Sequence, residues 1–141
     1  MYNTGCDIAD AILTDKQKMF ADKIKINFEG SLKNINSDNL DLCVLLNNTL
    51  NIATLLFDSN TSYDKTIDIK ARCVNGCLLY KLSSPVSNNI SIKHNKIKSP
   101  DNSNIYTFYL QTLGKLIKER SGNINFGFSD NNLDFDIKYQ F

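Results

Sequence analysis

A continuous apolar helix is the sequence feature that most restricts how this chain can fold. The segment from Asp41 to Leu56 reads DLCVLLNNTLNIATLL, and its apolar residues recur at helical spacing along one side. Asn47, Asn48 and Asn51 interrupt the segment, although asparagine is a poor helix former because its short amide competes for nearby backbone groups. Two interpretations stay open. The asparagines reflect an asparagine-rich composition, or they mark a polar site on one side of a buried helix.

Length and composition indicate one folded domain over residues 1–141. Hydrophobic residues make up 42% of the chain, which is enough for a core, and the net charge is +1. Acidic and basic residues are mixed along the sequence, so nucleic acid is not an expected partner. No apolar run is long enough to span a bilayer, and the N-terminus lacks the pattern of a secretory signal. We therefore expect a cytoplasmic domain that is not itself inserted in a membrane.

The four cysteines predict little metal or disulfide chemistry. Cys73 and Cys77 flank the turn dipeptide Asn75-Gly76, a spacing compatible with a disulfide or with half of a metal site. His94, the one histidine, is not at a ligand spacing from them. Cytosolic thiols are usually reduced, so we expect four free thiols and no metal centre.

Periodicity predicts an alternation of helices and strands. We expect helices over Thr4–Ile24, Asp41–Leu56 and Ile105–Arg120, strands over Ile24–Phe28, Thr66–Cys73, Cys77–Leu82, Asn123–Phe128 and Leu133–Tyr139, and a long loop over Ser83–Ser103. Ser37-Asp38 is expected to cap the second helix, and Gly122 to end the third as a helix C-terminal glycine. The order α-β-α-ββ-α-ββ predicts a two-layer α/β sandwich, in which helices cover one face of a mixed, mostly antiparallel sheet.

Three strings of the sequence resemble a known family. They are TGCDIADAILTDK (Thr4 to Lys16), DLCVLLNNTLNIA (Asp41 to Ala53) and the closing LGKLIKERSGNINFGF. Together they are similar to the ATP-binding catalytic domain of sensor histidine kinases, in the superfamily shared with gyrase, mismatch-repair and heat-shock chaperone ATPases (the Bergerat fold). The subgroup that they resemble most is the peptide quorum-sensing kinases of Gram-positive bacteria.

The resemblance implies a nucleotide site on the asparagine-bearing helix. In the family, a first polar residue of this helix is followed one turn later by an asparagine that coordinates the magnesium bridging the ATP phosphates. By position, Asn48 keeps the first place, whereas Ile52 stands where that asparagine should be. Isoleucine offers no lone pair to Mg²⁺, which requires oxygen ligands. Asn51 is one position early, about 100° around the helix, so it does not simply substitute.

Two further family motifs are altered. The family places an acidic or amide residue after the central strand to accept a hydrogen from the adenine amino group, and Ser84 stands at that place. A glycine-rich loop normally closes over the phosphates, and here Thr107 and Tyr109 occupy the glycine places. Side chains of this size would fill the space that phosphate needs. The nucleotide-binding residues implied by the resemblance are thus Asn48, Asn51 and Ser84, with Ile52, Thr107 and Tyr109 as degenerate positions and no residue assigned a catalytic role.

The resemblance also implies cofactors and partners. ATP and Mg²⁺ are the family's cofactors, although the altered motifs argue against their use here. An intact kinase of this kind acts as a dimer through its phosphoacceptor helices and passes the phosphoryl group to a response regulator. The phosphoacceptor histidine of the family precedes the catalytic domain, so this sequence would be one part of a longer receptor. The alternative is a non-catalytic module with the same fold that acts through protein contacts.

Overall fold

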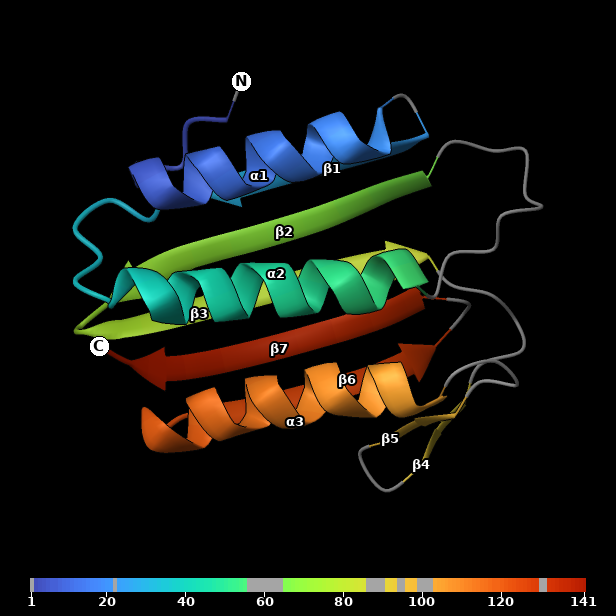
Figure 1. Ribbon diagram of the computed structural model, residues 1–141. Helices are drawn as coiled ribbons and strands as arrows, with labels where there is room; N and C mark the ends of the chain where they lie inside the picture. Colours follow the sequence, from blue (N-terminus) through green and yellow to red (C-terminus); the bar gives the residue numbers. More distant parts are fainter. Residues whose placement is uncertain are drawn as a thin grey trace.

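Helices lie side by side on one face of a sheet in the computed structural model, which describes residues 2–21, 23–55, 65–85, 91–93, 96–98, 103–129 and 132–141 (Figure 1). The described elements are α1 (Asp7–Phe20), β1 (Ile24–Gly30), α2 (Asn39–Leu55), β2 (Lys65–Val74), β3 (Cys77–Pro85), β4 (Ser91–Lys93), β5 (Lys96–Lys98), α3 (Ser103–Glu119), β6 (Asn123–Ser129) and β7 (Asn132–Gln140). No helix among them is long and apolar enough to cross a membrane.

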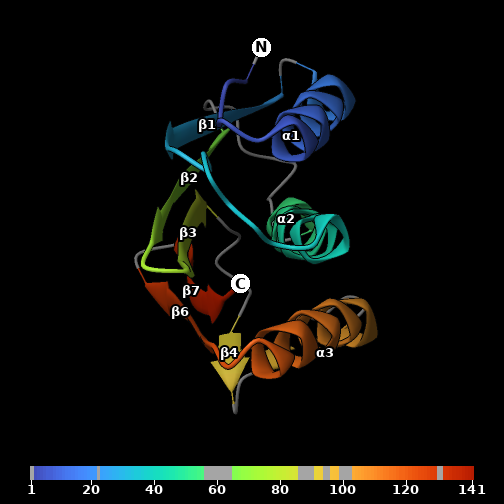
Figure 2. The same ribbon diagram turned by 90° about the vertical axis from the view of Figure 1, so that its left-hand side faces the viewer.

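The main sheet is mixed and mostly antiparallel. Its five strands follow the order β1-β2-β3-β7-β6, in which β1 and β2 run parallel and the other neighbours run antiparallel. Figure 2 shows α1, α2 and α3 on one side of this sheet, with the other side uncovered by any described element. The predicted two-layer α/β sandwich is confirmed.

Strand alternation explains why one face of the sheet is buried. In β7, Leu133, Phe135, Ile137 and Tyr139 point to the helices and are at most 1% exposed, while the residues between them are exposed. A sequence of period two places all its apolar side chains on one face, and burying that face against helices removes it from water. α2 supplies the largest share of the opposing layer, with Leu42, Leu45, Leu46, Leu50, Ile52 and Ala53 all buried.

The first helix is shorter than the sequence predicts. α1 covers Asp7–Phe20 rather than Thr4–Ile24. Thr4 is buried outside the helix, and its backbone N–H donates to Asp10 Oδ1 at 2.7 Å. At the other end Ala21 adopts a positive φ of 51°, which ends the helix, and Met19 is 74% exposed rather than part of the apolar side. Helical periodicity alone does not locate these ends, because local backbone contacts decide them.

The segment predicted as one long loop, Ser83–Ser103, contains regular structure. β3 continues to Pro85, a small antiparallel pair is formed by β4 and β5, and α3 already begins at Ser103. His94 lies outside the described residues. The other expected features are confirmed in outline: Asn75-Gly76 turns β2 into β3, and the backbone N–H of Leu40 donates to Asp38 Oδ1 at 2.8 Å as a helix N-cap requires. The cysteines of the described residues are all free thiols.

The end of α3 uses Gly122 differently from the prediction. Ser121, not Gly122, has the positive φ, at 54°. The N–H of Gly122 donates to Ile117 O at 2.9 Å and that of Ser121 donates to Lys118 O at 3.2 Å, which is the pattern of a Schellman motif. Gly122 is required for space instead, since a Cβ there would lie 2.0 Å from Lys138 O on the neighbouring β7.

The two glycines of this region should therefore respond oppositely to alanine. Gly122→Ala forces the β7 backbone away and should lower the free energy of unfolding by at least about 2 kcal/mol. Gly114→Ala is the matched control, because nothing lies within 4 Å of its would-be Cβ in α3, and should stabilise the chain by about 0.5–1 kcal/mol. Urea unfolding followed by circular dichroism measures both. Equal effects of the two substitutions would contradict the close approach of Gly122 to Lys138.

Candidate functional site

The asparagine that keeps the family's first polar position is turned inward. Asn48 is 9% exposed on α2, and its Nδ2 donates to the carbonyl of Val44 one turn earlier at 2.7 Å. This bond satisfies one hydrogen of the amide within the helix itself.

Asn51 contacts a lysine from another helix. The ammonium of Lys16, on α1, donates to Asn51 Oδ1 at 2.7 Å. Burial lowers the pKa of Lys16, as expected for an ammonium that is partly removed from water. A neutral amide oxygen gives this charge a hydrogen bond but no opposite charge. The polar side of α2 is therefore used, at least in part, to hold α1.

Ile52, which the resemblance aligns with the family's magnesium-binding asparagine, belongs to the core. Its side chain is 0% exposed and packs with the buried residues of the sheet and helices. A hydrocarbon side chain in this place contributes packing and offers no ligand atom to a metal.

Ser84 is also withdrawn from solvent. It lies on the helix-facing side of β3, opposite Leu133 of β7, with an exposed fraction of 0%. Its Oγ donates to the carbonyl of the next residue, Pro85, at 3.3 Å. The hydroxyl oxygen keeps the capacity to accept a hydrogen bond, although Ser84 itself is covered.

Thr107 and Tyr109 lie inside α3 and not in a glycine-rich loop. Tyr109 packs partly against the core, and its ring meets that of Phe108 edge-on, with centroids 5.9 Å apart.

In the described part of the chain, no hydrogen bond joins Asn48, Asn51 and Ser84 to one another. That same part holds no cluster of three or more histidine, cysteine or acidic residues that could bind a metal.

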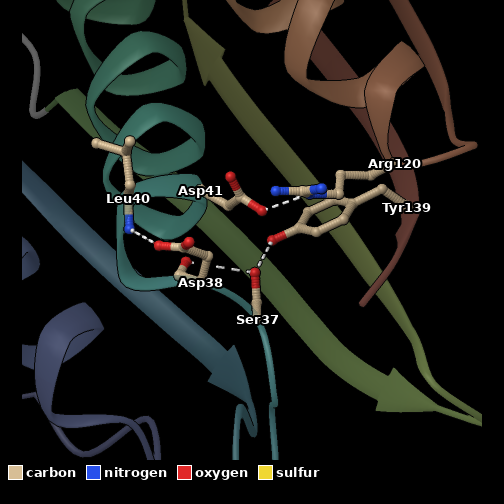
Figure 3. A network of polar contacts seen from close by, with 6 residues as sticks. All are labelled: Ser37, Asp38, Leu40, Asp41, Arg120 and Tyr139. Carbon is tan, nitrogen blue, oxygen red and sulfur yellow. Dashed lines mark hydrogen bonds and ion pairs between the residues drawn. The ribbon is translucent and has the colours of Figure 1, made fainter.

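A polar network that sequence reasoning missed lies at the other end of α2. Figure 3 shows Arg120 Nε, just beyond α3, donating to Asp41 Oδ2 in the first turn of α2 at 2.6 Å. Beside it, the hydroxyls of Ser37 and Tyr139 share a hydrogen bond of 2.9 Å. Ser37, Asp41 and Arg120 border a polar hollow of about 440 Å³, which Asp38 and Glu119 also line.

Helix electrostatics account for the ion pair in this network. A carboxylate at the first turn of a helix and a cation just past the last turn of another each face the favourable end of a helix dipole. The hydrogen bond from Arg120 to Asp41 is the main cause that raises the pKa of the guanidinium. Burial raises the pKa of Tyr139, and its bond to Ser37 opposes this shift. Asp41 at a helix start and Arg120 at a helix end are the sequence signals for this ion pair, but the sequence does not show that these two helix ends lie side by side.

Similar solved structures are histidine kinases. The histidine kinase AdeS of Acinetobacter baumannii is 13% identical, with a TM-score of 0.68 over 94% of this chain, which spans 62% of the AdeS chain. The mycobacterial sensor histidine kinase MprB is 10% identical, with a TM-score of 0.71 over 95% of this chain and 92% of its own. The catalytic domain of histidine kinase ThkA is 18% identical, with a TM-score of 0.68 over 95% and 91% of the two chains. No protein-family model and no curated protein matches the sequence.

These likenesses define the class of fold. The chain has the α/β sandwich of histidine kinase catalytic domains, as the resemblance of its sequence strings implied. At such low identity the likeness extends to the fold and not to the chemistry of the site.

The Lys16–Asn51 contact predicts a gain of stability on replacing the amide by a carboxylate. Asn51→Asp supplies an opposite charge to the ammonium and should raise the free energy of unfolding by about 0.5–1 kcal/mol near pH 7. Pairing depresses the pKa of the new carboxyl in the folded state, so the gain should be fully present above the unfolded-state pKa of about 4 and be lost as the pH falls below it, through the lower folded-state pKa. Urea unfolding at pH 7 and pH 3 measures it.

The control for this prediction is Asn47→Asp, which adds a carboxylate to the same helix at a position with no recorded bond to Lys16. A gain that persists in the double variant Lys16→Met/Asn51→Asp would show that the ammonium is not its source.

Proposed function

We propose that this chain is the ATP-binding-type domain of a sensor histidine kinase in which the nucleotide site is degenerate. It keeps the fold of the class and works as a regulatory or dimerising module rather than by phosphoryl transfer. Support comes from the fold shared with histidine kinase catalytic domains and, above all, from Ile52, which is fully buried at the position where the family has its magnesium-binding asparagine.

The surroundings of Ile52 support the same proposal. Mg²⁺ is held in near-octahedral geometry by oxygen atoms, and phosphoryl transfer depends on its bridging of the phosphates. Asn51 precedes Ile52 on the same helix, and its Oδ1 accepts from the Lys16 ammonium at 2.7 Å. The Lys16 ammonium, 2.7 Å from this oxygen, would repel a divalent cation bound to it. The helical course of α3 through Thr107 and Tyr109 also leaves no glycine-rich turn at those positions.

The proposed partners follow from the class. The domain would pack on dimerisation helices of a histidine kinase, in the cytoplasmic part of a receptor of the bacterial peptide quorum-sensing type. A response regulator would be a partner only if phosphoryl transfer were retained. ATP and Mg²⁺, the cofactors expected for the family, would have no functional role in this domain.

Calorimetric titration of the purified chain with ATP and ADP tests the proposal. We expect no binding heat at millimolar nucleotide, and no rise of the melting temperature, with or without Mg²⁺. Binding in the micromolar-to-millimolar range, about −8 to −4 kcal/mol, that strengthens on adding Mg²⁺ would overturn the proposal. Such binding would mean that the chain is a working kinase domain with different phosphate contacts.

Restoring the family residue at position 52 should fail to restore a metal site. Ile52→Asn places an amide in a closed apolar environment and should lower the free energy of unfolding by about 3 kcal/mol, without creating Mg²⁺-dependent ATP binding. Ile52→Val is the matched control and should cost only about 1 kcal/mol. If the asparagine variant is as stable as the parent and binds Mg²⁺–ATP, position 52 faces a nucleotide cavity and the assignment of Ile52 to the core is wrong.

A further inference from the structure

The face of the sheet opposite the helices carries an ordered arrangement of charge. Figure 2 shows that no described element covers this face. The side chains that alternate with the buried ones point to it, among them Lys70 and Arg72 of β2, Lys81 of β3 and Lys138 of β7. Its charge pattern can therefore be followed from the strand register.

Cations gather at one part of this face. Lys70 is directly opposite Lys81, and Arg72 is opposite Leu79, which in turn is opposite Lys138. Like charges directly across two strands destabilise a sheet. Of the four cations, Lys70 alone has an ion pair within the described residues, to Glu29 at 3.6 Å, and both side chains of that pair are largely exposed. Asp136 of β7 lies opposite Lys81, as Glu29 lies opposite Lys70, whereas Arg72 and Lys138 have no acidic residue directly across from them among the described strands. The positive charge is thus offset in part, and least at Arg72 and Lys138.

Three of these cations, Lys70, Arg72 and Lys81, surround a hollow with an apolar floor. The hollow has a volume of about 310 Å³. Gly30, Ala71 and Leu79 line it together with Lys70, Arg72 and Lys81, and Glu29, the ion-pair partner of Lys70, is the acidic residue of this lining. Gly30 has a φ of 113°, and a Cβ there would lie 2.0 Å from Ala71 O, so only glycine fits this close approach of β1 to β2 beside the hollow. The combination accepts a ligand with negative charges beside an aliphatic group.

We propose that this hollow binds a short acidic segment of a protein partner, with an aliphatic side chain over Leu79 and carboxylates beside Arg72 and Lys81. Opposite charge across an interface favours encounter and fixes orientation. A short peptide is favoured over an extended polyanion or an anionic membrane, because Asp68, Asp134 and Asp136 lie on the same face and would repel a large anionic surface. The site uses the uncovered face of the sheet, so it is independent of whether nucleotide binds on the helix side.

Fluorescence anisotropy with a labelled ten-residue peptide of alternating glutamate and leucine tests this inference on the intact chain. We expect saturable binding with a dissociation constant near ~100 µM at low salt, weakening as salt is added. The same peptide with glutamine in place of glutamate should not bind. The double variant Arg72→Gln/Lys81→Gln should weaken binding at least about tenfold, which corresponds to about 1.4 kcal/mol.

Lys25→Gln is the matched control, since Lys25 is an exposed cation of β1 that does not line the hollow, and it should bind like the parent. Circular dichroism of each variant confirms folding, because these side chains are exposed. Absence of peptide binding at millimolar concentration overturns the inference. So does equal binding by the parent and the double variant, or binding to phosphatidylserine vesicles without binding to the peptide. The ATP titration decides the proposed function separately, and neither result determines the other.

Discussion

The burial of α2 is the constraint on which the rest of this structure depends. The helix packs against α1 on one side and α3 on the other, while its apolar face covers the centre of the sheet (Figure 1). A helix in that position has few directions in which a polar side chain can reach water. Each polar group that it carries must therefore find a partner inside the protein, since an unpaired buried polar group costs about 1–3 kcal/mol.

The polar residues of α2 show how that requirement is met. Thr49 is fully buried and donates to the carbonyl of Leu45 at 2.8 Å, so the hydroxyl of Tyr80, 2.8 Å away, acts as donor to Thr49. Burial raises the pKa of Tyr80, which keeps this phenol protonated. Asn48 bonds within its own helix and Asn51 bonds to Lys16. The polar side chains of Thr49 and Asn51 thus connect α2 to the sheet and to α1.

The two faces of the sheet consequently offer different chemistry. The helix-facing side holds the core, in which Asn48, Ile52 and Ser84 are buried. The open side carries exposed charges and a shallow hollow, which suit protein contacts more than catalysis. A fold supports many functions because its framework is independent of the side chains that line its surfaces. Under the proposed function, this framework is retained while its ligand chemistry has changed.

The sequence alone determined the layers of this protein and most of their order. Period-two alternation in segments such as Thr66–Cys73 and Leu133–Tyr139, the Asn75-Gly76 turn and the apolar stripe of the asparagine-bearing helix are local patterns, and each acts within a few residues. The family strings also placed Asn48, Asn51 and Ile52 on that helix. What these side chains contact could not be predicted, because the partners Val44, Lys16 and the core residues around Ile52 are selected by how helices pack. The same holds for Gly122 against Lys138, for the pairing of Arg120 with Asp41, and for the row of Arg72, Leu79 and Lys138. These contacts join residues far apart in the chain, so only the tertiary structure decided them.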